Sequence, residues 1–140
     1  MVNLVQARND LRDLFNQTKI NVDFLVNDDG VLKVKGNVTL KDLDDDIMII
    51  MGIYENGSFY FDLIFDKLHD RESAYEIINE INDNFAWIKA YVRNDDYFVL
   101  RYTTLDMYNE NLASNVEYLL TYFASDELYE YLKQICVLTQ

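Results

Sequence analysis

Few residues of this chain have the types and spacing that chemistry requires. The sequence contains one histidine, His69, which lies between Asp66 and Asp70, and one cysteine, Cys136. A histidine with a pKa of about 6.5 can act as a base, and a cysteine becomes reactive when nearby positive charge stabilises its thiolate. Cys136 comes near the end of a predicted helix, where the helix dipole disfavours a thiolate. We therefore interpret His69 as a polar residue between a strand and a helix and Cys136 as a core residue, and we predict no catalytic residue.

The aspartates of residues 41–46 match the first part of a calcium loop. Counted from Asp42, carboxylates occupy the first, third and fifth positions, as an EF-hand requires. The sixth position should be glycine but is Ile47, and the twelfth should be glutamate but is Ile53. We therefore predict no metal ion and no cofactor, and we interpret the segment as a solvated acidic loop whose charge attracts a partner. Its candidate partner-binding residues are Asp42, Asp44, Asp45 and Asp46.

The net charge of −13 is distributed unevenly along the chain. Residues 1–40 carry as many basic as acidic residues, so residues 41–140 hold the whole excess. Such a field repels phosphate backbones, whose binding requires Lys and Arg to displace counterions. The sequence therefore predicts no direct nucleic-acid binding and favours a protein partner with a basic surface. Solubility alone is the other interpretation of this charge.

Apolar periodicity predicts four helices and six strands. Apolar residues recur at three- and four-residue steps in the helical segments, which are about residues 2–16, 70–85, 112–123 and 126–138. Alternating or continuous apolar residues mark the strands, which are residues 20–26, 32–38, 47–54, 58–65, 86–92 and 97–103. Asn56-Gly57 predicts a type I′ hairpin turn, which needs positive φ at two residues. Further turns are expected at residues 27–30 and 94–96.

The chain has no proline, four glycines and no visible linker or repeat, so we expect one domain over residues 1–140. Because tight turns join the strand partners, the sheet should be largely antiparallel. We expect about five to six strands, with the helices packed on one face. The predicted class is α+β, in the order α-ββββ-α-ββ-αα.

Aromatic residues are the remaining candidates for binding. Tyr118 and Tyr122 lie one helical turn apart beside an inward-facing stripe, so they either fill the core or form a self-association or client surface. Trp87 alternates with Ile88 on the fifth predicted strand. We expect it to share a face with further candidates, on what is either an ordinary solvated sheet face or a dimer or client contact; these are Lys89, Tyr91 and Arg93.

Three stretches resemble the YbjN family: SAYEIINEIN at residues 73–82, FAWIKAYV at 85–92 and YFVLRY at 97–102. The common pattern is a helix with an Asn-Glu-Ile-Asn ending, an aromatic-bearing strand, a short acidic turn and a strand ending in Arg-Tyr. Those proteins resemble class I type III secretion chaperones in fold. The resemblance implies an α+β sandwich that forms homodimers, binds proteins and carries no established catalytic residue. This chain departs from the pattern in the extra helix at residues 126–138 and in the acidic loop at 42–46.

The leading hypothesis is a non-catalytic protein-binding module, chaperone-like or regulator-like. It would act through an exposed sheet face or a dimer groove, with acidic residues steering the encounter. An enzyme is least favoured, because no paired carboxylates stand out. The single cysteine fits a reducing cytoplasm. No apolar run approaches the ~20 residues that span a bilayer, and charges interrupt the N-terminal segment where a signal peptide would be apolar, so we expect a cytoplasmic protein without a membrane partner.

The alternative hypothesis is an acidic, phage-type inhibitor that mimics DNA and blocks a nucleic-acid-binding protein. A row of carboxylates at helical spacing on the second predicted helix supports it; these are Glu72, Glu76, Glu80 and Asp83. Such a row can imitate the spacing of DNA phosphates. It is also consistent with a plain solvated helix face, on which like charges one turn apart repel weakly.

Overall fold

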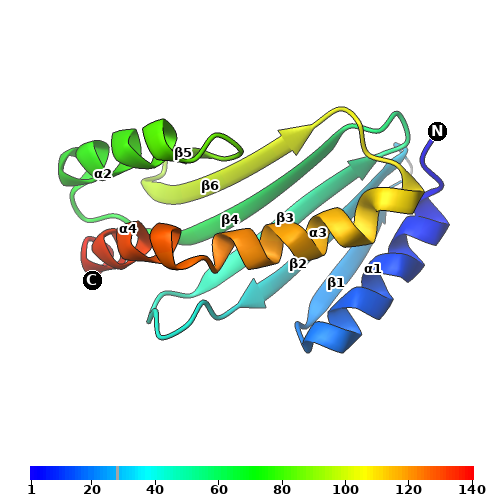
Figure 1. Cartoon of the computed structure of the whole chain (residues 1–140), viewed down its shortest axis with the longest axis horizontal. Coiled ribbons are helices and arrows are strands. Elements are labelled where there is room, and N and C mark those ends of the chain that lie inside the picture. Colours follow the sequence, from blue (N-terminus) through cyan, green and yellow to red (C-terminus); the bar gives the residue numbers. More distant parts are fainter. Residues whose placement is uncertain (28) are drawn as a thin grey trace.

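A computed structural model of the chain describes residues 1–27 and 29–140 and confirms the predicted α+β class and element order (Figure 1). The elements in chain order are α1 (Leu4–Thr18), β1 (Val22–Asn27), β2 (Val31–Val38), β3 (Ile47–Tyr54), β4 (Phe59–Lys67), α2 (Arg71–Asn84), β5 (Lys89–Val92), β6 (Tyr97–Thr104), α3 (Asn109–Phe123) and α4 (Asp126–Val137).

The six strands form one open sheet in the order β1-β2-β3-β4-β6-β5, and every neighbouring pair is antiparallel. Hairpins join the first four strands consecutively. The chain then passes through α2 to the far edge and returns as the β5–β6 hairpin, which places β6 beside β4. The predicted antiparallel sheet is therefore confirmed, and it has six strands.

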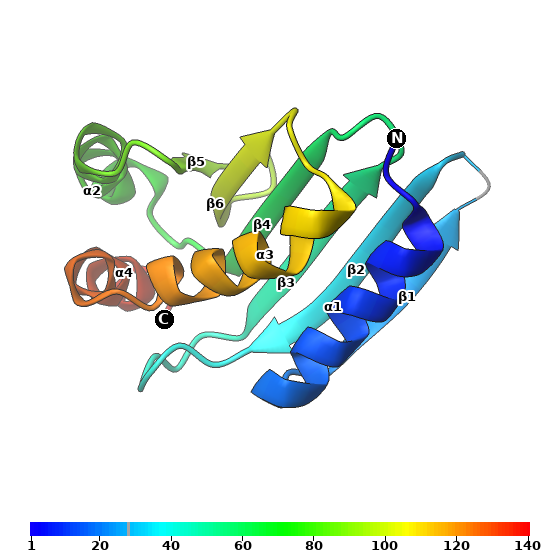
Figure 2. The same ribbon diagram turned by 45° about the vertical axis from the view of Figure 1, so that its right-hand side comes forward.

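The helices lie on one side of the sheet, with α2 beside β5 and α4 (Figures 1 and 2). Because side chains alternate along a strand, each strand sends one set of residues toward the helices. This covered face holds the largest buried rings, including Phe61, which stacks on Phe123 of α3 with centroids 5.3 Å apart. The core also contains Phe65 and Phe98, at an edge-to-face centroid distance of 5.3 Å. The other set of side chains forms the open face, on which no helix of the described chain packs.

Local capping residues explain where two of the helices begin. Asp70 precedes α2, and its Oδ1 accepts a hydrogen bond from the backbone N–H of Ser73 at 3.2 Å, so Asp70 is the N-cap. Asn3 caps α1 in the same way through the backbone N–H of Gln6, at 3.0 Å. Ser125 stands at the N-cap position of α4, but its hydroxyl makes no hydrogen bond within the described residues.

Three local expectations differ from the structure. Strand β5 begins at Lys89 rather than at residue 86, because Trp87 lies in a turn after α2. The β3–β4 connection is a four-residue loop, residues 55–58, in which only Gly57 has positive φ, at 93°, so it is not a type I′ turn. The turn expected at residues 27–30 includes Asp28, which lies outside the described residues.

Candidate functional site: an aromatic pocket on the helix side

Trp87 lies in the turn between α2 and β5, so the alternation of a strand does not govern its direction. Its side chain is 64% exposed. It lines a hollow on the helix side together with Tyr102 of β6 and with Tyr118 and Tyr122 of α3. The structure thus joins three predicted candidates, Trp87, Tyr118 and Tyr122, which come from two distant segments of the chain.

The hollow has a volume of about 280 Å³ and is lined mainly by aromatic rings. We call it the aromatic pocket; its lining residues are Trp87, Tyr102, Asn115, Tyr118, Leu119 and Tyr122. The rings of Tyr118 and Tyr122 stack at a centroid distance of 6.3 Å and an angle of 26°. Tyr118 is 62% exposed, whereas Leu119 is buried. The pocket therefore has an apolar floor and exposed aromatic walls.

Helical spacing and the core hold these rings in place. Tyr122 lies next to Phe123 in the last turn of α3, and the burial of Phe123 in the core fixes that turn. Phe85, just after α2, meets Tyr122 edge-to-face at 6.2 Å and meets Tyr131 of α4 at 5.9 Å. Burial raises the pKa of Tyr122, and the neighbouring Tyr118 and Glu127 raise it further. The phenol of Tyr122 therefore stays neutral at physiological pH.

A second aromatic cluster lies on the open face around an ion pair. Arg101 of β6 donates from Nε and Nη2 to the two carboxylate oxygens of Asp62 on β4, both at 2.7 Å. The guanidinium carbon lies 5.5 Å from the ring centroid of Tyr60 and 5.7 Å from that of Tyr91. We call these four residues the arginine cluster. The hydrogen bonds from Arg101 to Asp62 raise the pKa of the guanidinium, so it remains charged.

A glycine on the neighbouring strand positions one ring of the arginine cluster. Gly52 of β3 pairs with Tyr60 of β4. A Cβ atom at Gly52 would lie 2.2 Å from Cε1 of Tyr60, so the ring lies directly over the glycine. Aromatic side chains commonly cover glycines in this way on sheets. Only a residue without a side chain allows Tyr60 to lie in this position.

The other sheet candidates do not share a face with Trp87, contrary to expectation, and none of them lines the aromatic pocket; they are Lys89, Tyr91 and Arg93. Lys89 pairs with Arg101 in the β5–β6 ladder, and its ammonium lies 5.7 Å from the Tyr91 ring centroid on the open face. Arg93 follows β5 and forms a surface ion pair with Asp95 at 2.6 Å. The reason for the difference is the turn at Trp87, which breaks the two-residue period before the strand begins.

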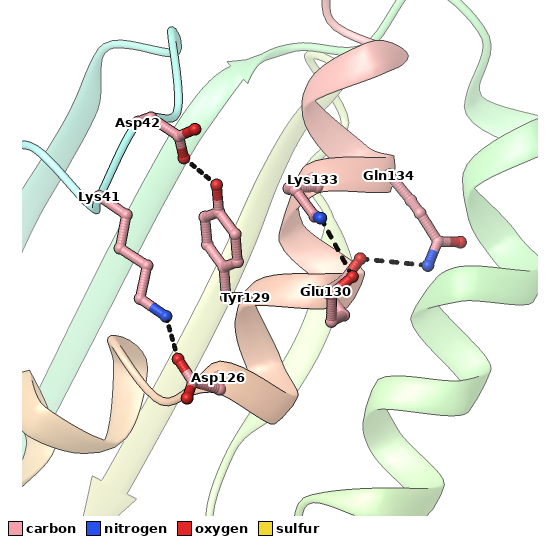
Figure 3. A network of polar contacts seen from close by, with 7 residues as sticks. All are labelled: Lys41, Asp42, Asp126, Tyr129, Glu130, Lys133 and Gln134. Carbon is pink, nitrogen blue, oxygen red and sulfur yellow. Dashed lines mark hydrogen bonds and ion pairs between the residues drawn. The ribbon is translucent and has the colours of Figure 1, made fainter.

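The acidic loop is fastened to α4 rather than fully solvated (Figure 3). Lys41 forms an ion pair with Asp126 at the start of α4, and Asp42 accepts a hydrogen bond from the Tyr129 hydroxyl. The ammonium groups of Lys41 and Lys133 lie 4.5 and 5.2 Å from the Tyr129 ring centroid. The loop and the extra helix are the two features in which this chain departs from the YbjN pattern. In the structure they pack against each other.

The expectation of a solvated loop is wrong most clearly for Asp45, which is only 7% exposed. Its carboxylate accepts hydrogen bonds from the Thr139 hydroxyl at 2.8 Å and from the backbone N–H of Asp66 at 3.4 Å. These donors compensate for its burial. Asp44 and Asp46 are exposed. Within residues 1–27 and 29–140, no group of three or more His, Cys, Asp or Glu residues is arranged to hold a metal ion.

The two residues of greatest intrinsic reactivity lie apart from the aromatic pocket. His69 is exposed, and its backbone N–H donates to the Leu138 carbonyl at 2.9 Å. Cys136 is buried, and burial together with the nearby Asp45 raises the pKa of its thiol to about 12. A thiol with this pKa is protonated at physiological pH and is a poor nucleophile. The interpretation of Cys136 as a core residue is confirmed.

Sequence reasoning missed several members of these clusters. Tyr102 and Asn115 join the aromatic pocket, and Tyr60, Asp62 and Arg101 form most of the arginine cluster. One signal was present: Asp62 is the only charged residue between Phe59 and Phe65, where every other residue is apolar or aromatic. Such a residue needs a partner when it is buried. The register between β4 and β6 supplies that partner and is not readable from the sequence.

Comparison with known proteins identifies no family for this chain. No protein-family model matches the sequence, and no curated protein matches it significantly. Among solved structures, the chain is similar to the Yersinia pestis type III secretion chaperone SycH, whose structure was determined in complex with a stable fragment of YscM2. The identity is 15%, the match covers 83% of this chain and 95% of that chain, and the TM-score is 0.46.

Membership of the YbjN family stays a prediction. In the part of the chain that the structure describes, no helix has both the length and the apolar character needed to cross a bilayer. What this chain binds has to be argued from its own residues.

Proposed function

We propose that this chain is a non-catalytic protein-binding module and that the aromatic pocket is its main contact surface. The observation that carries the proposal is the presence of exposed Trp87 and Tyr118 side chains around one apolar hollow. Trp and Tyr dominate the energetics of protein interfaces, because they bury a large area at a modest entropy cost. Exposed rings that converge in this way are typical of a contact site.

The partner that fits this surface is a protein with basic residues. The chain carries a net charge of −13, and a charge of this size accelerates encounter with a basic surface. The exposed carboxylates of α2 add to this field, and two of them, Glu80 and Asp83, lie toward the end of the helix that precedes the turn with Trp87; the other two are Glu72 and Glu76. Direct nucleic-acid binding remains disfavoured for the same electrostatic reason.

Two copies of the chain would form a homodimer in this proposal. The open face supports it, because half-buried apolar residues such as Met48 and Ile50 lie there without a covering helix. Light scattering between about 5 and 100 µM is the test, since a dimer that dissociates does so with dilution. The proposed location is the cytoplasm, which suits a chain whose single cysteine is buried and has no disulfide partner.

Affinity capture with matched variants tests the protein-binding function. We expect the wild-type chain to retain a specific protein from its native lysate at ~0.15 M salt, where long-range attraction is largely screened. Trp87→Ala and Tyr118→Ala should each reduce retention of that protein at least about tenfold, the size of effect expected for interface hot spots.

Tyr75→Ala is the control, because Tyr75 is an exposed tyrosine on α2 outside the pocket lining, and it should retain the partner. Equal retention by all variants would remove the aromatic pocket from the interface. The DNA-mimic alternative stays a prediction. It would be favoured if the captured protein bound nucleic acid and were released steeply by salt, with no dependence on Trp87.

A further inference from the structure

Several tyrosines of this chain lie beside a cation that the chain itself supplies. Arg101 lies beside Tyr60 and Tyr91, and Lys41 and Lys133 lie on Tyr129. These contacts are favourable because the faces of aromatic rings carry negative charge density. The aromatic pocket is different: within the described residues, none of its lining side chains is cationic, and no Lys or Arg lies over its rings.

The backbone around the aromatic pocket adds further negative potential. Helices α2 and α3 both end close to it, since Phe85 at the end of α2 contacts Tyr122 in the last turn of α3. The carboxyl end of a helix carries a partial negative charge that favours cations. The end of α2 therefore contributes negative potential, whereas the end of α3 is opposed by the positive amino end of α4, which begins at Asp126. Neither helix has a basic residue in its last turn. The start of α4 contributes the carboxylate of Glu127, which is close enough to raise the pKa of Tyr122.

Besides the tyrosine hydroxyls, one side chain of the lining can accept a hydrogen bond. Asn115 donates from Nδ2 to the sulfur of Met107 at 3.8 Å. No donor from the described residues reaches its Oδ1. The amide oxygen therefore offers an acceptor beside the rings, which is the complement that a guanidinium N–H needs.

We propose that the aromatic pocket binds an arginine side chain of the partner protein. The inference deepens the proposed function and rests on it for the source of that side chain. Rings on several sides, an amide acceptor and negative potential without a resident cation form a site for an organic cation. Arginine fits better than lysine because its planar, weakly hydrated guanidinium stacks on aromatic faces and donates hydrogen bonds in its plane.

Short peptides test this assignment directly, because Trp87 is the only tryptophan of the chain and its fluorescence reports on the pocket. The probes are acetyl-Gly-Ser-Xaa-Ser-Gly-amides in which Xaa is arginine, citrulline, lysine or trimethyl-lysine. Citrulline has nearly the shape of arginine without its charge. At ~0.15 M salt we expect saturable binding of the arginine peptide, with an affinity about tenfold above that of the citrulline peptide.

Variants of Tyr118 distinguish the contribution of the aromatic face from the contribution of apolar surface alone. Tyr118→Phe keeps the aromatic face and should bind the arginine peptide within about twofold of wild type, whereas Tyr118→Leu should lose about three- to tenfold. Tyr75→Leu, outside the pocket lining, is the control and should bind normally. Circular dichroism confirms the fold of each variant, so that a loss of binding can be attributed to the pocket.

Three results would overturn the arginine assignment: equal affinity for the arginine and citrulline peptides, wild-type affinity of Tyr118→Leu, or tighter binding of lysine or trimethyl-lysine than of arginine. The inference and the proposed function fail separately. If lysate capture depends on Trp87 but the peptides show no preference, the arginine site is wrong and the protein-binding function stands. If the arginine peptide binds selectively but capture ignores Trp87 and Tyr118, the arginine site stands and the proposed function is wrong.

Discussion

The arginine cluster and the aromatic pocket are built from similar side chains, yet they differ in one component. In the arginine cluster, Tyr60 and Tyr91 flank a guanidinium that Asp62 holds with two hydrogen bonds of 2.7 Å. In the aromatic pocket, Trp87 and Tyr118 border a hollow whose lining, among the residues that the structure describes, carries no charged side chain. In the arginine cluster the chain supplies both the rings and the cation. In the aromatic pocket the chain supplies the rings alone, and they are exposed to solvent.

This difference separates a structural role from a binding role. Asp62 is 5% exposed, and its removal would leave Arg101 without its carboxylate. Trp87, at 64% exposed, supports little of the fold. We therefore expect substitutions in the arginine cluster to change the free energy of unfolding, and substitutions in the pocket to change binding with the fold intact.

The largest effect is expected for Asp62→Ala. The substitution removes a buried carboxylate that accepts two charge-assisted hydrogen bonds, and it should lower the free energy of unfolding by about 2 kcal/mol. The loss falls short of that for a fully buried pair because Arg101, whose side chain is 41% exposed, can turn to water. Urea unfolding followed by circular dichroism measures it.

Asp95→Ala is the matched control for Asp62→Ala, since Asp95 pairs with Arg93 at the surface, where both side chains are nearly half exposed. Its cost should be clearly smaller than that of Asp62→Ala, because water screens an exposed pair. Equal costs for the two aspartates would show that the arginine cluster is no more structural than an ordinary surface ion pair.

An intermediate effect is expected for Gly52→Ala. Alanine is normally better than glycine in a strand, but here its Cβ would lie 2.2 Å from Cε1 of Tyr60. Displacing the ring should cost about 1 kcal/mol in unfolding free energy. In a Tyr60→Ala background the same change should be neutral or stabilising, because the clash is gone. An additive double variant would contradict the placement of the ring over Gly52.

The smallest effect on stability is expected for Trp87→Ala. An exposed side chain outside the core should change the unfolding free energy by no more than about 0.5 kcal/mol, while partner binding is lost. Urea unfolding followed by circular dichroism is the measurement, because the variant has no tryptophan fluorescence. A loss of unfolding free energy as large as that of Asp62→Ala would make Trp87 a structural residue. It would contradict the distinction between a structural cluster and a binding pocket.

The sequence predicted the helices and strands well where the apolar period was long. Strand β3 was predicted at residues 47–54 and is Ile47–Tyr54, and the last helix was predicted at 126–138 and is Asp126–Val137. Prediction was poorest where one residue could belong to two elements. Trp87 fitted the alternation of a strand, but the chain turns there, and only the packing of α2 against β5 decides that.

The sequence by itself determined the α+β class, the element order and the acidic character, because these follow from local periodicity and from a sum of charges. Tertiary structure decided which side chains meet. Strand register brings Asp62 to Arg101, the packing of α4 buries Asp45, and the turn after α2 carries Trp87 to Tyr118. The reason is physical: contacts between distant segments depend on the packing of the whole chain, and a local pattern contains no information about its distant neighbour.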